Sequence, residues 1–342
     1  MKNVLMAEAI AALRDHTGIV IPVYIPQGVD VKAAKQLLDD TVGACCREIA
    51  DPQAVCLSVD GPGPAKAIVQ TVAEARGVQV VCSDKNRGKL SAVRNGMARL
   101  LGNPDLRYVT AMDQDGDHFA NELLNFVRAA RHVETCLQTD QVMVLGRRIS
   151  RHRPMGFLRG ELEELADRIM LDALQYDAAV RGQPLRLQFA NTLDEVPDFH
   201  SGYKLFTRAT STAISTGEEH RGDVPDDGYY RHAVEAVITI EAIKSGATLA
   251  VVNRSTIDEQ PISTFGLLNR QQMVADKIIW PCKRLGIPAA FVDQWLRNHM
   301  PRLLLGTLVP EGREELLGIR RRVLRAYGVS VEDDPLMRPL FI

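Results

Sequence analysis

Three aspartates follow a short apolar run in the stretch YVTAMDQDGDHF, residues 108–119. Asp113, Asp115 and Asp117 stand at alternate positions, and alternate side chains of an extended chain share one face. Carboxylates crowded in this way need a cation or protons to offset their repulsion. Open α/β sheets bind ligands at the carboxyl ends of their strands, so we predict a divalent metal that carries phosphate groups; an acidic turn in water is the alternative.

The segments that position this loop alternate between strand and helix patterns. Apolar strands are predicted in TGIVIPVYIP, AVCLSVD, VQVVCSD and LRYVTAMD, and helices between them in VKAAKQLLDDTVGACCREI, PAKAIVQTVAEARG and KLSAVRNGMARLLG. The order βαβαβαβ predicts an α/β fold with a mostly parallel sheet and helices on both faces.

The second half of the chain has a looser pattern. Strands are predicted in QVMVLGRRI, DFHSGYKLFTR and ATLAVVNRS, and a helix in YYRHAVEAVITIEAIKSG. From about residue 265 the pattern is helical only. We therefore predict a domain over residues 1–264, with a nucleotide-binding half at 17–118 and an acceptor half at 119–264, and a helical extension over 265–342.

Composition narrows the class of protein. Hydrophobic residues make up 46% of the chain, charged residues 25%, and the formal net charge is −2, which is typical of a globular protein and does not favour nucleic-acid binding. No apolar run reaches the roughly 18 residues of a membrane span. Acidic residues interrupt the amino-terminal segment where a secretory signal would stand, so we expect a cytoplasmic protein.

Four pieces of sequence follow one another in a fixed order: IVIPVY, VCLSVDGPG, NRGKLSAVRNGM and YVTAMDQDGD. Each stands at the end of a predicted strand or the start of the next helix. Together they resemble the nucleotide-sugar-binding half of GT-A glycosyltransferases of the family-2 type, over about the first 120 residues. The resemblance implies a GT-A fold and transfer of a sugar from a nucleotide-diphospho-sugar, such as a UDP- or GDP-sugar, to an acceptor hydroxyl.

The resemblance also implies roles for particular residues. Asp113 and Asp115 match the DxD motif, in which one aspartate reaches the ribose and the other holds Mg²⁺ or Mn²⁺ on the diphosphate. The remaining implied donor contacts in the first half are Pro22, Tyr24, Asp60, Lys89 and Arg94. Asp117 has no counterpart, and we interpret it as the solvated aspartate of a turn.

Weaker similarities continue in the second half. The segment DFHSGYKLFTR stands where such enzymes close over the donor sugar, which makes Gly202 and His200 candidates; an ordinary strand start is the alternative. Glu235 matches the first acid of the family's acidic pair, but Ala236 replaces the second. An inverting reaction needs a carboxylate base, so Glu235 and Asp227 are the catalytic candidates.

A further layout resembles retaining GT-A enzymes that glycosylate glycerate or phosphoglycerate. Asp258 is the nearest substitute for their metal-binding histidine, with a surface-loop acid as the alternative. The stretch RRISRHRPMGFLRG, residues 147–160, holds five arginines. Arginine forks suit phosphate or carboxylate, which favours an anionic acceptor, although a solvated basic face opposite the acidic segment ELEELAD explains them equally well.

Two other functions remain open. An apolar strand followed by DxDG also opens haloacid-dehalogenase-like phosphohydrolases, with Asp113 as nucleophile, but three βα units before the strand argue against that class. Ala236 leaves room for a sugar-nucleotide-binding protein without catalysis. Trp280 and Trp295 in the helical extension would suit a homodimer contact.

Overall fold

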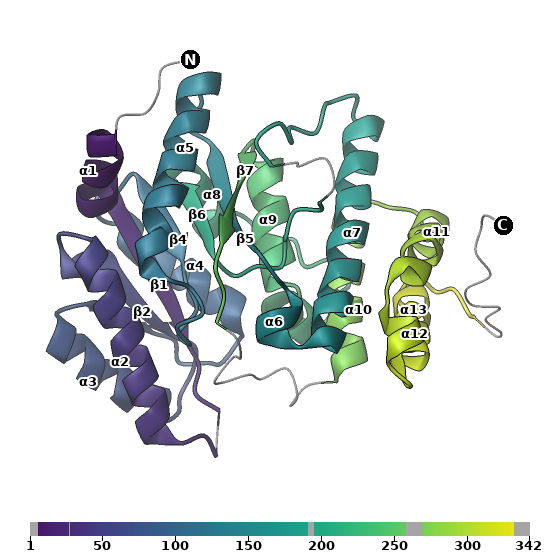
Figure 1. Cartoon of the computed structure of the whole chain (residues 1–342), viewed down its shortest axis with the longest axis horizontal. Coiled ribbons are helices and arrows are strands. Elements are labelled where there is room, and N and C mark those ends of the chain that lie inside the picture. The colour runs from purple at the N-terminus through teal and green to yellow at the C-terminus, as the bar shows by residue number, and fades with distance from the viewer. Residues whose placement is uncertain (1–5, 27, 191–194, 258–268, 332–342) are drawn as a thin grey trace.

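A seven-stranded sheet forms the centre of the molecule (Figure 1). The computed structural model describes residues 6–26, 28–190, 195–257 and 269–331. The strand order is β3-β2-β1-β4-β6-β5-β7, and only β6 runs antiparallel to its neighbours, β4 and β5. The strands are β1 (Thr17–Val23), β2 (Val55–Val59), β3 (Gln79–Cys82), β4 (Tyr108–Ala111), β5 (Val142–Arg148), β6 (Lys204–Thr207) and β7 (Thr248–Arg254).

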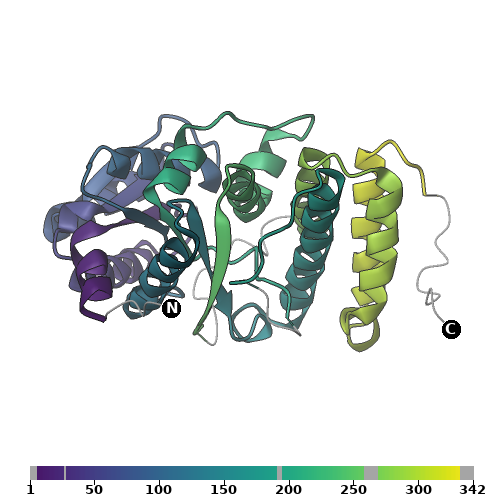
Figure 2. The same ribbon diagram turned by 90° about the horizontal axis from the view of Figure 1, so that it is seen from above.

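Helices cover both faces of the sheet (Figure 2). One face carries α1 (Met6–His16), α2 (Val31–Glu48), α3 (Ala65–Arg76) and α5 (Leu123–Leu137), and the other carries α4 (Lys89–Leu101), α8 (Arg208–Thr216) and α9 (Val234–Lys244). Every residue of β1, β2 and β4 is buried, as expected for parallel strands between two helical layers. The predicted α/β fold class, with a mostly parallel sheet, is therefore confirmed.

Capping residues begin and end two of these helices where the sequence predicts. Asp30 caps α2, because its carboxylate accepts hydrogen bonds from the backbone N–H groups of Lys32 and Ala33. Gly77 ends α3 in the left-handed region, with φ 71°. These caps fix where α2 begins after β1 and where α3 ends before β3.

The remaining helices lie beyond the β7 edge of the sheet (Figure 1). They are α6 (His152–Met155), α7 (Phe157–Val180), α10 (Arg270–Arg284), α11 (Ala289–His299), α12 (Leu305–Leu308) and α13 (Gly312–Ala326). α10 packs against α7 and α13, and its buried side chains join the same hydrophobic core as the sheet. The boundary at residue 265 stays a prediction.

The expectation that Trp280 takes part in a dimer contact is wrong. Its side chain is 1% exposed and packs against Tyr229, because α10 turns this face inward. Trp295 is half-buried and contacts Tyr176 and Phe291. In the described part of the chain, no helix combines the length and apolar character that crossing a membrane requires.

Candidate active site

The predicted donor residues gather at the carboxyl ends of neighbouring strands. Pro22 lies near the end of β1 and Tyr24 follows that strand, Asp60 follows β2, and Asp113 follows β4. Gln114 ties two of these ends together, because its side-chain amide donates to the Tyr24 carbonyl at 2.6 Å and its Oε1 accepts from the Tyr24 N–H at 3.1 Å. The acidic loop is therefore held against the end of β1, beside Tyr24, which is 47% exposed.

A lysine links the acidic loop to the second half of the chain. Lys89, the first residue of α4, places its Nζ 2.7 Å from Asp113 Oδ1 and 2.9 Å from Glu235 Oε1. Glu235 lies in the first turn of α9. Three predicted site residues, from three separate elements, are thus in direct contact.

The charges at this contact affect the acids in opposite ways. Burial would raise the pKa of Asp113, but the Lys89 ammonium outweighs it and holds that pKa well below its ordinary value. Burial and the Asp113 carboxylate raise the pKa of Asp115 to about 6. Asp115 accepts one hydrogen bond, from the Asp117 N–H at 3.2 Å, and forms no ion pair within the described residues. It is the acid of this loop whose charge lacks compensation.

Gly202 lies directly against the same contact. A Cβ atom at this position would stand 2.8 Å from Asp113 Oδ2, 3.2 Å from Lys89 Nζ and 3.2 Å from His118 Cε1. Only a residue without a side chain leaves these groups in place. The antiparallel strand β6 brings Gly202 to this position.

His118 was not predicted, although it follows the three aspartates directly. Its ring is buried, stacks on Tyr203 with 4.7 Å between ring centroids, and accepts a hydrogen bond from the Asp113 N–H at Nδ1. Burial lowers the pKa of His118 well below its ordinary value, so the ring is neutral and fixes the backbone of Asp113. The position of His118 directly after the aspartate motif was the feature of the sequence that could have indicated this role.

Lys204 is a second residue that sequence reasoning missed. Its side chain is fully buried in β6, and its Nζ donates to the carbonyls of Phe199 and Ser201. Burial lowers the pKa of Lys204 to about 8. These hydrogen bonds shape the backbone that leads into Gly202, and the spacing of the sequence carries no sign of them.

The interpretation of Asp117 as a solvated turn residue is wrong. Its side chain is buried, forms an ion pair with Arg254 at 3.0 Å, and accepts from the Ile257 N–H at 3.2 Å. Arg254 is buried as well, at the end of β7. Asp117 therefore anchors the acidic loop to the last strand of the sheet.

Two implied donor residues have other partners in the structure. The Asp60 carboxylate accepts hydrogen bonds from the backbone N–H groups of Arg87 and Gly88, so it shapes the loop before Lys89. Arg94 donates to the carbonyl of Gly217 and lies 3.7 Å from Glu219, outside the acidic loop's contacts.

The candidate bases occupy different environments. Burial would raise the pKa of Glu235, but Lys89, Lys204 and Lys277 hold it below its ordinary value. Asp227 has a side chain that is 71% exposed and pairs with Arg231 at 2.8 Å. Glu235 is the candidate that touches the acidic site.

His200 lies in a buried ionic network beside the site. Its Nδ1 is 2.7 Å from Asp167, and Arg151 reaches the same acid at 3.0 Å. Arg148 pairs with Asp198 at 2.5 Å. The segment that leads to Gly202 is thereby fastened to α7.

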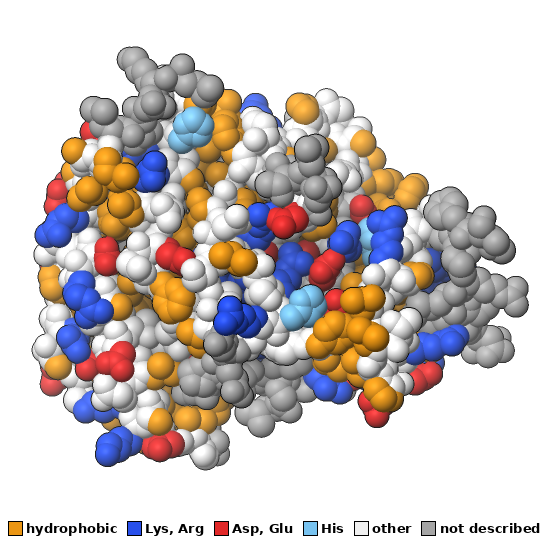
Figure 3. All heavy atoms as spheres, viewed as in Figure 1, with side chains coloured by type: hydrophobic (Ala, Val, Ile, Leu, Met, Phe, Trp, Pro, Cys, Tyr) orange, Lys and Arg blue, Asp and Glu red, His pale blue; other side chains and the backbone are white. Residues whose placement is uncertain are grey.

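The predicted arginine-rich stretch lines a hollow of about 320 Å³. Basic and acidic side chains gather near the middle of the face shown in Figure 3, where α6 and α7 adjoin β5. Arg148 and Arg159 of this stretch pair with Glu163 of α7, and Arg151 pairs with Asp167 of the same helix. These contacts support the part of the alternative in which the basic stretch faces the acidic segment, but Arg148 is buried and not solvated. They leave less positive charge for an anionic acceptor.

The described residues offer oxygen ligands for a divalent cation, but no group of three or more metal-binding side chains. Mg²⁺ uses one or two protein carboxylates together with substrate phosphates, so Asp113 and Asp115 fit this requirement. The raised pKa of Asp115 is what an uncompensated metal ligand would show. Asp258 lies outside the described residues.

Comparisons with known proteins give matches to solved structures alone. No protein-family model matches the sequence, and no curated protein matches it. The solved structures that match include glucosyl-3-phosphoglycerate synthase from Mycobacterium tuberculosis, solved with Mg²⁺ and UDP (17% identity, 84% of this chain and 86% of that chain covered, TM-score 0.48). Another is described as a mycobacterial protein (19% identity, 84% and 81% covered, TM-score 0.47), and a third is S. aureus TarS (12% identity, 92% and 91% covered, TM-score 0.41). At these values, function has to be inferred from the residues of the site.

Proposed function

We propose that this protein is a glycosyltransferase that uses a nucleotide-diphospho-sugar donor and a divalent cation. The observation that carries the proposal is the contact of Asp113, Lys89, Glu235 and Gly202 at the carboxyl edge of the sheet, next to the uncompensated Asp115. This edge is where α/β sheets bind nucleotides.

Different residues of the chain bind different parts of the donor. Pro22, Tyr24 and Asp60 border the place for the nucleoside, and Asp113 and Asp115 would hold the cation. A bound Mg²⁺ or Mn²⁺ supplies positive charge that offsets the charge developing on the leaving diphosphate. Lys89, at the amino terminus of α4, adds an ammonium group where the helix dipole also favours anions.

Glu235 and Gly202 define the side from which the sugar meets its acceptor. In an inverting reaction a carboxylate takes the acceptor proton, and Glu235 is the candidate at the site, with Asp227 as the second. Its lowered pKa keeps Glu235 ionised but weakens it as a base. Because Glu235 contacts Lys89 at the site whereas the side chain of Asp227 is 71% exposed, Glu235→Gln should lower turnover more than Asp227→Asn.

A thermal-shift panel tests the proposal. UDP-, GDP-, ADP- and dTDP-sugars are compared with and without Mn²⁺, on the wild type and on Asp115→Asn, because a ligand that binds only the folded state raises its melting temperature. Metal-dependent stabilisation by one nucleotide class, lost in the variant, supports the transferase. Stabilisation by phosphate and Mg²⁺ without any nucleotide effect would favour the phosphohydrolase instead.

Turnover distinguishes an enzyme from a protein that only binds. Release of the nucleoside diphosphate from the stabilising sugar nucleotide is measured on the same samples, with glycerate, phosphoglycerate and neutral sugars as acceptors. Stabilisation without release under any of these conditions would indicate a binding protein, as the replacement of the second acid by Ala236 allows.

A further inference from the structure

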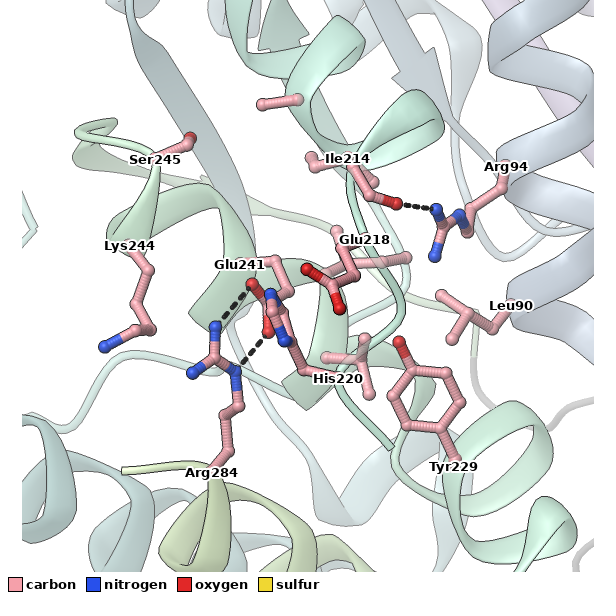
Figure 4. Close-up of a pocket in the computed structure, with 14 residues that line it drawn as sticks. Leu90, Arg94, Ile214, Glu218, His220, Tyr229, Glu241, Lys244, Ser245 and Arg284 are labelled. Atoms are coloured by element: carbon pink, nitrogen blue, oxygen red, sulfur yellow. Dashed lines mark hydrogen bonds and ion pairs between the residues drawn. The ribbon is translucent and has the colours of Figure 1, made fainter. Parts of the chain in front are cut away.

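A second pocket of about 250 Å³ lies apart from the acidic loop. Its walls come from α4, α8, α9, the carboxyl end of α10 and the segment after α8 (Figure 4). The volume is below the range of about 300–1,000 Å³ that is typical of sites for drug-sized ligands, which favours a ligand of one ring.

A buried hydroxyl group without a partner marks this pocket as a binding site. Tyr229 is 0% exposed, and its hydroxyl has no hydrogen-bond partner within the described residues. In Figure 4 the hydroxyl end of its ring is directed toward the side of the pocket where Glu218 lies. Burial raises the pKa of Tyr229 to about 12, so the hydroxyl keeps its proton and can both donate and accept. Buried hydroxyls without partners are costly, and a ligand would supply the missing bond.

The charges that line the pocket are largely balanced. Arg284 forms two hydrogen bonds with Glu241, at 2.6 and 3.0 Å, and Arg94 donates to the Gly217 carbonyl beside Glu219. A ligand with a large net charge would therefore meet no matching excess of the opposite sign.

The polar groups that remain available in the pocket include both hydrogen-bond donors and hydrogen-bond acceptors. Within the described residues, Glu218 offers acceptors, Lys244 offers donors and the His220 ring offers one of each, and none of these side chains has a partner there. Hydroxyl groups of a ligand can satisfy all three, because each hydroxyl donates and accepts. Leu90, Ile214, Val237 and Ile238 add an apolar surface for the carbon skeleton of such a ligand.

We propose that this pocket binds a neutral polyhydroxyl ligand of the size of one monosaccharide ring. None of the residues that line this pocket belongs to the acidic loop, so we expect its occupancy not to depend on the donor or on a metal. The proposal goes beyond glycosyl transfer, since binding here needs no reaction.

Trp280 gives a direct readout of this pocket. It packs against Tyr229 with 5.7 Å between ring centroids, and its Nε1 donates to the His220 carbonyl at 3.0 Å. The chain contains two tryptophans, so Trp295→Phe leaves Trp280 as the only indole. In that background, fluorescence and isothermal titration are recorded with D-glucose, D-galactose and myo-inositol, and with glycine and inorganic phosphate as probes of other chemical classes.

We expect saturable binding of at least one of the three polyhydroxyl probes. Tyr229→Phe should weaken it about tenfold, the size expected for one hydrogen bond, while thermal unfolding shows that the variant is folded. Asp115→Asn should bind the probe as well as the background protein does. The proposal is overturned if none of the three probes binds by either method, if glycine or phosphate binds in their place, or if Tyr229→Phe binds with unchanged affinity.

Discussion

Replacing Asp115 with asparagine should stabilise the folded protein at neutral and alkaline pH. The pKa of this carboxyl group rises from 3.8 to about 6 on folding, because it is buried beside Asp113. Above pH 6 the folded protein therefore holds a charge that costs stability. A difference of about 2 pH units corresponds to about 3 kcal/mol, and the asparagine oxygen can still accept the hydrogen bond from the Asp117 N–H.

The pH dependence of this effect has a definite sign. Below pH 3.8 the carboxyl group is protonated in both the folded and the unfolded chain, so Asp115→Asn should change the free energy of unfolding little. The advantage of the variant should grow as the pH rises through the interval between 3.8 and about 6 and stay constant above it. At pH 5 we expect about 1–2 kcal/mol, and at pH 8 about 3 kcal/mol.

Denaturant unfolding in EDTA at pH 4, 5 and 8 measures this difference, with Asp117→Asn as the matched control. Asp117 is two residues away, but it pairs with the buried Arg254, so its replacement should cost about 3–5 kcal/mol. Adding Mn²⁺ with the stabilising nucleotide should raise the stability of the wild type more than that of Asp115→Asn. An Asp115→Asn protein that is no more stable than the wild type at pH 8 would refute the assignment of Asp115 as an uncompensated ligand.

Three further substitutions test the contacts of the site. Gly202→Ala should cost about 1–3 kcal/mol in denaturant unfolding and weaken metal-dependent nucleotide binding in the thermal-shift assay, because its Cβ would stand 2.8 Å from Asp113 Oδ2. Unchanged nucleotide binding would show that the donor does not reach this contact. Lys89→Met removes the ammonium group that Asp113 and Glu235 share. The stability of this variant relative to the wild type should therefore improve as the pH falls and the two acids take up protons. A loss of stability that is independent of pH in unfolding experiments would contradict this. Arg148→Met leaves Asp198 and Glu163 buried without this partner and should cost about 3–5 kcal/mol, measured against the exposed pair variant Arg221→Met, which should change stability by less than about 1 kcal/mol.

The sequence contains enough information to place the acidic loop. Apolar strands that alternate with amphipathic helices allow few arrangements, and the end of the fourth strand had to lie at the ligand-binding edge. Asp113 and Asp115 were therefore predicted at that edge, whereas the resemblance implied Lys89 there, and the structure brings Asp113 and Lys89 into contact. Glu235 joined the prediction only through the family resemblance.

The errors involve partners that lie far away in the sequence. Asp117 was interpreted as a turn residue, but it pairs with Arg254, 137 positions later, and no local pattern indicates that pair. In the sequence Lys204 resembles an ordinary lysine of a strand, and only the folded structure shows that it is buried. The Trp280 side chain points inward because α10 packs against Tyr229, and helical periodicity alone does not specify this contact. Local patterns establish elements, whereas the burial of a charge depends on contacts between them.

The antiparallel strand β6 has a consequence for how the chain folds during synthesis. β6 lies between β4 and β5 in the sheet, yet the ribosome makes it after both. The Thr110 hydroxyl of β4 donates to the carbonyl of Lys204 in β6, which is synthesised 94 positions later, so this hydrogen bond cannot form before then. Until then β4 and β5 each expose an unpaired edge, and such edges are prone to associate with other chains. We therefore expect a ribosome-bound nascent chain that ends before β6 to be a preferred target for chaperones, and one that extends past β7 to be released.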